Sequence, residues 1–467
     1  MKEITPFLDQ RSNTPIYIQL SHYFKNEIIK GKIKANEQLP SKRTLAKYLD
    51  ISLNTVQSAY DQLRAEGYIE SKERKGMYVQ PIDKDQLLGV LSTNNQRQLP
   101  QNNNVDYLID FNSGRVDLEH FPYNVWRKLT TEALYRDQSH LFNIGDPQGE
   151  LSLRTEIASY LYQSRGVNCN PEQIIIAAGT QPLVGMLAIL IGRSNDFAIE
   201  DPGFHRTKQV LDDYGIGTIP VSLDQSGLSV DSLRQSKAKA VYVTPSHQFP
   251  CGMIMPISRR LELLKWAEET GGYIIEDDYD GEYRYKGRPI PSLQGLDRHD
   301  CVIYLGTFSK ALIPSIRVSY VVLPTTLVAK YHSQFTIYKQ TVSRLHQDTL
   351  CRFMNQGYWQ RHLNRMRTLY RKKQQVLLTA IGEYMGDSVQ IVGEHAGLHI
   401  LLTVKNGMKE EELIESAAKK RVKVYPTSIY YNNVNASGEA EILLGFGGLP
   451  VKDIEEGIRL LKDAWVL

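Results

Sequence analysis

The sequence predicts an α/β protein with two folded parts, a small N-terminal helical unit and a larger domain built around a mostly parallel sheet. Helical periodicity fills residues 15–80, a polar stretch without periodicity covers 81–106, and apolar strand-like runs alternate with helical stretches over 107–467. A chain of 467 residues is also too long for one ordinary core. We therefore expect an N-terminal domain over 1–80, a linker, and a second domain after it.

The composition is that of a globular protein, with 42% hydrophobic and 23% charged residues. The N-terminus lacks the apolar core of a signal peptide, and no apolar stretch is long enough to cross a bilayer. We therefore expect a cytoplasmic protein with no membrane partner. The four cysteines lack metal-ligand spacing and predict packed thiols, with neither disulfides nor a metal site: Cys169, Cys251, Cys301 and Cys351.

The net charge of +3 is unevenly divided along the chain. Residues 1–80 contain 13 lysines and arginines against nine aspartates and glutamates, an excess of four, so the remainder carries −1. This modest basicity at the N-terminal end is what a nucleic-acid-binding unit requires.

Three helices are expected in the N-terminal unit, over 15–30, 42–49 and 53–66. The first carries apolar residues four apart and ends at Gly31. The second follows a cap at Ser41, and a turn over 50–52 separates it from the third. This order predicts a helix-turn-helix.

The third helix leaves polar side chains at its exposed leading end, where a recognition helix meets base edges: Asn54, Thr55, Gln57 and Ser58. Residues 68–79 follow as two short strands around a basic turn, which predicts a wing with Arg74 and Lys75 near DNA phosphates. A small helical interaction domain whose charges are merely solvated is the alternative interpretation.

In the second domain, strands are expected over 173–177, 196–199, 240–243, 273–275 and 301–305. Their alternation with helices predicts a mostly parallel sheet covered on both faces. Such a sheet opens its ligand crevice at the carboxyl ends of the strands. Candidate site residues are therefore those that follow these strands.

Lys310 follows the last of these strands. An amine there loses hydration, so its charged form is disfavoured and it can form a Schiff base with an aldehyde, which we take to be pyridoxal 5′-phosphate (PLP). Arg317, with Thr307 and Ser309, could neutralise the cofactor phosphate. A solvated surface lysine is the plain alternative.

The acidic run over 276–280 follows another strand. A carboxylate there can hold a pyridine nitrogen protonated and make the ring an electron sink, and Asp277 is our choice for that role. Tyr279 is expected on the ring hydroxyl. Acidic clusters at strand ends also serve as helix caps or loop charges, so the motif alone is weak.

Two further strand ends complete the predicted site. Gly179, Thr180 and Gln181 open a helix whose exposed amides form an anion site for the cofactor phosphate. Phe204 could stack on the pyridine ring, and Arg206 could reach the carboxylate of an effector. A mere strand-to-helix turn is the alternative for the glycine segment.

Residues 1–80 resemble the winged-helix domain of GntR-family transcription factors. The resemblance rests on Leu39-Pro40-Ser41-Lys42-Arg43, Thr55-Val56 and Gly67-Tyr68. It implies contacts with double-stranded promoter DNA from six residues: Arg43, Ser52, Asn54, Thr55, Gln57 and Lys75. The family usually has arginine after the serine that starts the recognition helix, where this chain has Leu53.

The second domain resembles a fold-type I aminotransferase, and the fusion resembles the MocR/GabR-type regulators over almost the whole chain. The most specific stretches are 244–252, 276–280 and 306–310. The resemblance implies that Lys310 carries PLP as an internal aldimine and that the domain senses a ligand rather than turning over substrate. It also implies head-to-tail homodimers.

Three positions depart from the aminotransferase pattern. Phe249 stands where asparagine usually contacts the ring hydroxyl, and Ile144 replaces a tyrosine that contacts the phosphate from the neighbouring subunit. The strand expected over 441–446 carries no arginine for a substrate carboxylate. Without that fixed cation, efficient catalysis on ordinary α-amino acids is disfavoured.

Three hypotheses remain. The first is a PLP-dependent transcriptional regulator that senses an amino compound or PLP itself through an aldimine at Lys310. The second is an active PLP-dependent aminotransferase with an accessory DNA-binding domain, since the same lysine could move protons as general acid and base. The third is a plain repressor whose second domain binds no cofactor.

Overall fold

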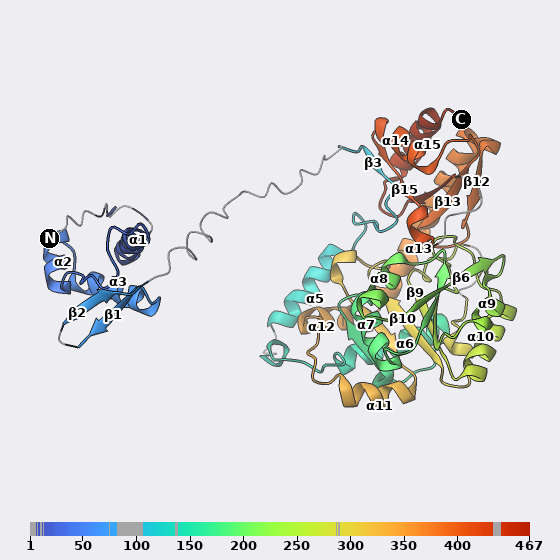
Figure 1. Ribbon diagram of the computed structural model, residues 1–467. Coiled ribbons are helices and arrows are strands. Elements are labelled where there is room, and N and C mark those ends of the chain that lie inside the picture. Colours follow the sequence, from blue (N-terminus) through green and yellow to red (C-terminus); the bar gives the residue numbers. More distant parts are fainter. Residues whose placement is uncertain are drawn as a thin grey trace. The chain divides into compact units, whose positions relative to one another are not determined.

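The computed structural model describes residues 6, 8–9, 12, 14–73, 75–81, 106–135, 139–285, 287, 290–432 and 440–467. The chain divides into two compact units, Met1–Asn103 and Asn104–Leu467 (Figure 1). Most of the expected linker lies outside the described residues, as does Arg74. None of the described helices combines the length and apolar character needed to span a membrane.

The N-terminal unit is a winged helix-turn-helix, as the sequence predicted. It contains α1 (Ile16–Ile29), α2 (Lys42–Leu49), α3 (Leu53–Ala65) and the antiparallel hairpin of β1 (Ile69–Lys72) and β2 (Gly76–Val79) (Figure 1). Ser41 Oγ accepts the N–H of Thr44 at the start of α2, and Asp50 ends that helix in the left-handed region at φ 52°.

The core of this unit joins all three helices to the hairpin. Its central side chains are fully or almost fully buried: Leu20, Phe24, Leu45, Val56, Tyr60, Leu63 and Val79. The apolar spacing that predicted the helices is therefore the spacing that fills this core. Apart from Leu53, which is 46% exposed, the exposed side chains at the start of α3 are polar.

The larger unit is built on an eight-stranded sheet in the order β4-β11-β10-β9-β8-β5-β6-β7. The strands are β4 (Ile174–Ala177), β5 (Phe197–Asp201), β6 (Thr218–Asp224), β7 (Gly227–Leu228), β8 (Ala240–Val243), β9 (Tyr273–Asp278), β10 (Val302–Thr307) and β11 (Ser319–Val322). Strands β10, β9, β8, β5 and β6 run parallel, whereas β11 pairs antiparallel with β10 and β4. The mostly parallel sheet predicted from the sequence is confirmed.

Helices cover both faces of this sheet (Figure 1). On one face, Ile275 and Ile303 pack with Leu187 of α7 (Thr180–Ile191), while on the other Ile274 packs with Trp266 of α10 (Ile257–Thr270). Neighbouring strand residues therefore point to opposite cores. The other helices of this part are α5 (Tyr123–Tyr135), α6 (Leu151–Arg165), α8 (His205–Asp213), α9 (Val230–Gln235), α11 (Thr325–Gln334) and α12 (Arg344–Asn355).

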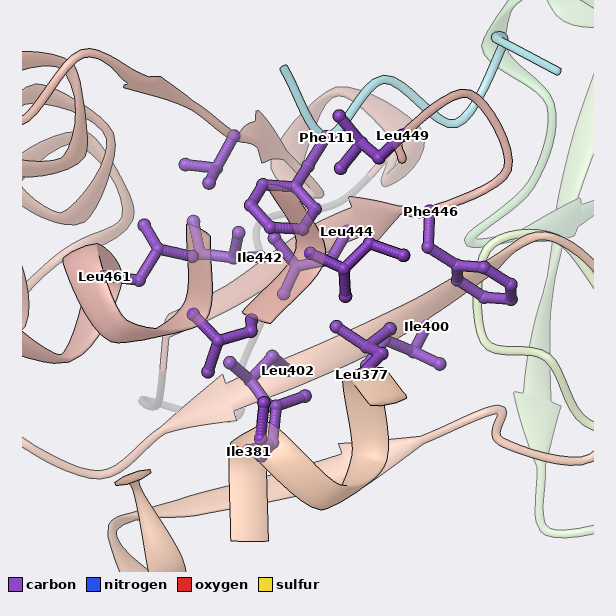
Figure 2. Packing of buried hydrophobic residues seen from close by; sticks show 14 of the residues in the cluster. Phe111, Leu377, Ile381, Ile400, Leu402, Ile442, Leu444, Phe446, Leu449 and Leu461 are labelled. Atoms are coloured by element: carbon purple, nitrogen blue, oxygen red, sulfur yellow. The ribbon is translucent and has the colours of Figure 1, made fainter. Parts of the chain in front are cut away.

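A second, antiparallel sheet has the order β12-β13-β16-β15. Its strands are β12 (Val389–Val392), β13 (His399–Val404), β15 (Tyr425–Pro426) and β16 (Ala440–Gly445), with helices α13 (Tyr358–Tyr384), α14 (Glu410–Lys419) and α15 (Val451–Trp465). In Figure 2, Leu377 and Ile381 of α13 lie against Ile400 and Leu402 of β13. Strand β3 (Ile109–Asp110) pairs with β14 (Val422–Lys423) and ties the start of this unit to its end.

Candidate functional site

A pocket of about 240 Å³ lies where β9 and β10 end and α7 and α8 begin. The eleven residues that the sequence predicted for cofactor and effector all line it: Gly179, Thr180, Gln181, Phe204, Arg206, Asp277, Tyr279, Thr307, Ser309, Lys310 and Arg317. A larger pocket of about 300 Å³ beside α7 and α11 contains no carboxylate in its lining. The smaller pocket is therefore the candidate site.

Lys310 projects into this pocket from the segment after β10. Desolvation lowers the pKa of its amine to about 8, and the charge of Asp280 offsets only part of that effect. The amine donates a hydrogen bond to the backbone carbonyl of Ser113, and no carboxylate in the described part of the chain forms an ion pair with it. A substantial fraction of this amine is neutral, and so nucleophilic, near pH 8.

Asp277 lies at the end of β9, opposite Leu305 of the parallel strand β10. Its Oδ2 accepts a hydrogen bond from Tyr242 Oη, while its buried Oδ1 has no partner among the described residues. Burial raises the pKa of this carboxyl to about 7, and Asp278 and Asp280 add to the shift. A buried acceptor of this kind calls for a donor that the described residues do not supply.

The other carboxylates of the acidic run have structural partners. Glu276 accepts the backbone N–H groups of Leu293 and Gln294 at 2.8 and 2.9 Å. Asp278 forms an ion pair with Arg165 at 2.6 Å. Neither of these two carboxylates lines the pocket, which leaves Asp277 as the acid of the run that does.

Aromatic side chains form one wall of the pocket. Phe204 stacks on Phe249 with a centroid distance of 4.1 Å and an interplanar angle of 2°, and it meets Tyr279 edge-on at 5.1 Å. One face of Phe204 is thus already covered, so a ligand ring could stack only on its other face. The hydroxyl of Tyr279 lies 2.9 Å from Nδ1 of His247.

The start of α7 forms the other end of the pocket. Gly179 has φ +98°, a backbone conformation that favours glycine, and a Cβ there would displace the guanidinium of Arg317 from its present place. Arg317 donates to the carbonyl of Ala178 at 3.3 Å. Beside it, Ser319 donates to the hydroxyl oxygen of Thr307 at 2.8 Å, so cation, hydroxyls and first-turn amides gather as an anion site requires.

Sequence reasoning missed several lining residues: Val184, Thr207, Val210, Tyr242 and Ser319. Tyr242 offered a weak signal, because a tyrosine inside an apolar strand needs a partner for its hydroxyl. Ser113 offered none, because its contact with Lys310 joins residues 197 positions apart. Arg206 is exposed at the start of α8, and no hydrogen bond or ion pair engages its guanidinium within the described residues.

The three departures from the aminotransferase pattern have distinct places. Phe249 is buried behind Phe204, whereas Ile144 is 75% exposed. Strand β16 carries no arginine, and its Leu443 is fully buried against Phe249 and Tyr430. The small sheet therefore presents an apolar surface to the aromatic wall.

The predicted DNA contacts fall into two groups. Arg43, Asn54 and Lys75 are exposed, on α2, α3 and the turn between β1 and β2. Ser52 and Thr55 bond to each other at the start of α3. The amide of Gln57 is held at both ends, accepting from Lys42 and donating to Asp61 at 2.7 Å.

Two family models match the chain. Residues 16–79 match the bacterial regulatory proteins of the gntR family, and residues 106–457 match aminotransferase class I and II. The crystal structure of Pyrococcus horikoshii kynurenine aminotransferase in complex with PMP superposes with a TM-score of 0.67 at 26% identity. It covers 83% of this chain and 95% of that one.

Several relatives match over nearly the full length, among them the following three. The uncharacterized HTH-type transcriptional regulator YdeL of Bacillus subtilis is 46% identical over 99% of both chains. The probable rhizopine catabolism regulatory protein MocR of Rhizobium meliloti is 32% identical, covering 98% of this chain and 95% of that protein. The pyridoxine biosynthesis regulator PdxR of Corynebacterium glutamicum is 30% identical, covering 98% and 97%. The chain therefore belongs to the MocR-type HTH transcriptional regulators, in which a GntR-family DNA-binding domain is joined to an aminotransferase class I domain.

Proposed function

We propose that this regulator binds PLP through Lys310 and senses an amino compound, or PLP itself, by forming an aldimine there, so that occupancy of the pocket changes its binding to promoter DNA. One observation carries the proposal. The amine of Lys310, with its pKa near 8, and the unpartnered Oδ1 of Asp277 line the same pocket. A reactive amine and a buried acceptor are what the aldehyde and the ring nitrogen of PLP require.

The rest of the pocket fits the remaining groups of PLP. The phosphate would be held by the first-turn amides of α7 and by Arg317, with hydroxyls of Thr307, Ser309 and Ser319 beside it. Tyr279 would meet the ring hydroxyl, and Phe204 would face the ring. PLP would supply an electrophilic aldehyde carbon, and side chains and backbone amides of this chain would bind and orient it.

Asp277 has a specific electrostatic role in this proposal. Its pKa near 7 shows that burial destabilises the carboxylate when nothing compensates the charge. A protonated ring nitrogen at Oδ1 would provide a charge-assisted hydrogen bond, while Tyr242 holds Oδ2 in place. Binding would therefore relieve a cost that the empty carboxyl carries.

The effector class follows from the cations of the pocket. Arg206 is the cation that would receive a carboxylate, because β16 carries no arginine of the kind that aminotransferases keep on this strand. The name of PdxR links that relative to pyridoxine biosynthesis, and the name of MocR links that one to rhizopine catabolism. These names favour PLP or an amino compound as the sensed molecule.

A contact of Lys310 suggests how occupancy would reach the DNA-binding domain. The free amine donates to the carbonyl of Ser113, a few residues beyond the segment that joins the two domains. Engaging the amine in a new bond would remove this contact and loosen the chain around Ser113, just after the β3–β14 pairing that holds the start of the domain. Promoter binding would then respond through the linker of a head-to-tail homodimer, with Arg43, Asn54 and Lys75 as the exposed DNA contacts.

An active aminotransferase with an accessory DNA-binding domain is the second candidate. It is favoured by the likeness to a kynurenine aminotransferase solved with PMP. Against it stands the apolar surface at Leu443, which lacks the fixed cation that positions an α-carboxylate. Multiple turnovers over a panel of amino donors at ordinary enzyme rates would support this candidate instead.

The decisive experiment is spectroscopic. Purified protein mixed with PLP should develop visible absorbance from the Schiff base, and Lys310→Ala should abolish it while leaving the fold and basal promoter binding intact. Titration with amines should then change both the spectrum and the affinity for promoter fragments. If the protein shows no visible absorbance before or after PLP is added, the proposal is refuted and a repressor without a cofactor is favoured.

A further inference from the structure

A buried histidine and aspartate lie behind Tyr279. His247 and Asp280 are each 2% exposed, and Nδ1 of His247 lies 3.0 and 3.1 Å from the two carboxylate oxygens of Asp280. The same Nδ1 lies 2.9 Å from the hydroxyl of Tyr279. The roles predicted from the sequence for the pocket residues involve neither His247 nor Asp280.

We propose that the Asp280–His247 pair is a positioning device that makes Tyr279 a hydrogen-bond donor into the pocket. A carboxylate can only accept, so the ring nitrogen beside Asp280 carries the proton and donates it. The oxygen of Tyr279 then faces the same N–H as a second acceptor. Its own O–H is left to donate elsewhere, and the pocket is where this side chain lies.

The ring of His247 is held in place by close backbone packing. A Cβ on Gly397, which has φ +71°, would overlap the imidazole and the carboxylate of Asp280. A Cβ on Gly252 would come within 3.2 Å of Nε2. Two glycines thus let backbone pack closely against the ring, which restricts its movement and favours the observed orientation of Nδ1.

The charged and titratable groups around this pair come from several elements. They are Glu200, Asp277, Asp278, Lys310 and His399. His399 donates from Nε2 to the carbonyl of Pro250 rather than to Tyr279, and burial beside His247 lowers its pKa to about 3, so it stays neutral. Asp280 is therefore the group with which His247 shares its proton.

This inference rests on the proposed PLP site for its main test. A hydrogen bond donated by Tyr279 stabilises negative charge on the ring oxygen of the bound chromophore, which favours its proton-poor form. His247→Phe removes the shared donor, so the tyrosine O–H turns to Asp280 instead. We expect the pH midpoint of the visible absorbance to rise by about one unit in this variant.

A double-mutant cycle separates positioning from general disturbance. Tyr279→Phe should raise the midpoint by a similar amount, and adding His247→Phe to it should cause no further rise. Additive shifts, or no shift in His247→Phe, would overturn the proposal. The matched control is His120→Phe, which breaks a His–Asp contact of 2.9 Å with Asp117 away from the pocket and should leave the midpoint unchanged.

A second readout needs no PLP. In the free protein, ¹⁵N spectra of labelled histidine should show the proton of His247 on Nδ1, and Asp280→Asn should weaken that preference; a proton on Nε2 would overturn the proposal. If wild-type protein forms no chromophore, the proposed function fails while this tautomer test still stands.

His247 and Asp280, together with His399, are also close enough to hold a metal ion. The possible ligand atoms of these three side chains lie within 4.8 Å of one another. An ion there would take the nitrogen lone pairs and set the tautomer itself. The midpoint and the tautomer should therefore be the same with a chelator as with added Zn²⁺. A shift on chelation would replace the proposal with a metal site.

Discussion

Two lysines of the aminotransferase domain show what separates a structural amine from a reactive one. Lys373 on α13 is 2% exposed, forms an ion pair with Asp117 at 2.7 Å and donates to the carbonyl of Gly447 at 2.9 Å. Lys310 has a carbonyl contact but no ion-paired carboxylate in the described residues, and its pKa falls to about 8. Burial alone does not make an amine nucleophilic; burial without a counter-charge does.

The largest difference should appear in stability. Lys373→Met leaves Asp117 buried without its cation and should lower the free energy of unfolding by about 3–5 kcal/mol. Lys310→Met removes a desolvated amine and strands no carboxylate, so without PLP it should be at least as stable as wild type. Urea unfolding followed by tryptophan fluorescence reports this domain alone, because all four tryptophans lie after residue 104. Equal losses of unfolding free energy in Lys373→Met and Lys310→Met would contradict the distinction between a structural and a reactive lysine.

The second largest difference should appear in PLP affinity, between variants of Asp277 and Asp117. Asp277→Asn removes the partner expected for the ring nitrogen and should weaken PLP binding about tenfold or more. Asp117→Asn should leave PLP affinity near wild type while lowering stability, because Lys373 loses its partner. Titration of each variant with PLP, followed by absorbance, measures both affinities. An unchanged affinity in Asp277→Asn would remove this residue from the site.

The pKa of Asp277 adds a pH signature to that variant. Its folded pKa of about 7 lies above the ordinary value of 3.8, so the unfolded state loses the proton first and the carboxyl costs stability as pH rises. Without PLP, Asp277→Asn should therefore be more stable than wild type above pH 7 and no different near pH 3. A difference that grows toward low pH would contradict the assigned shift.

The smallest expected effect concerns reactivity. With a pKa near 8, the neutral fraction of Lys310 should rise about tenfold between pH 7 and pH 9 and then level off. An ordinary lysine should gain about a hundredfold over the same range without levelling. Acylation of the PLP-free protein, read residue by residue by mass spectrometry, distinguishes the two profiles. If acylation of Lys310 instead rises about a hundredfold without levelling off, its amine has the pKa of an ordinary lysine.

Local patterns allowed much of the fold to be predicted. Apolar residues four apart, the cap at Ser41 and the turn over 50–52 placed the three N-terminal helices to within a residue or two, because such signals depend on near neighbours. Strands β8, β9 and β10 were found as short apolar runs for the same reason. Strand β11 was not expected, although Ser319 on it lines the pocket.

The candidate site was predicted as far as residues that follow strands. Asp277, Tyr279 and Lys310 were found because parallel strands end together at one edge of the sheet. The engagement of Gln57 with Lys42 and Asp61 was not foreseen, because a pattern of polar residues does not say which of them bond to each other.

The sequence by itself determined the order of domains, the periodicity of the helices and the residue types at each strand end, since these depend on positions close along the chain. Only the tertiary structure decided which buried amine has no ion-paired carboxylate, and which buried acid keeps an oxygen without a hydrogen-bond donor, among the described residues. Lys310 and Lys373 are both lysines, and their sequence neighbours do not show which one has an ion-pair partner. They differ because Asp117 forms an ion pair with Lys373 and not with Lys310. Contacts across hundreds of residues set the desolvation and counter-charge of a group, and no local pattern encodes them.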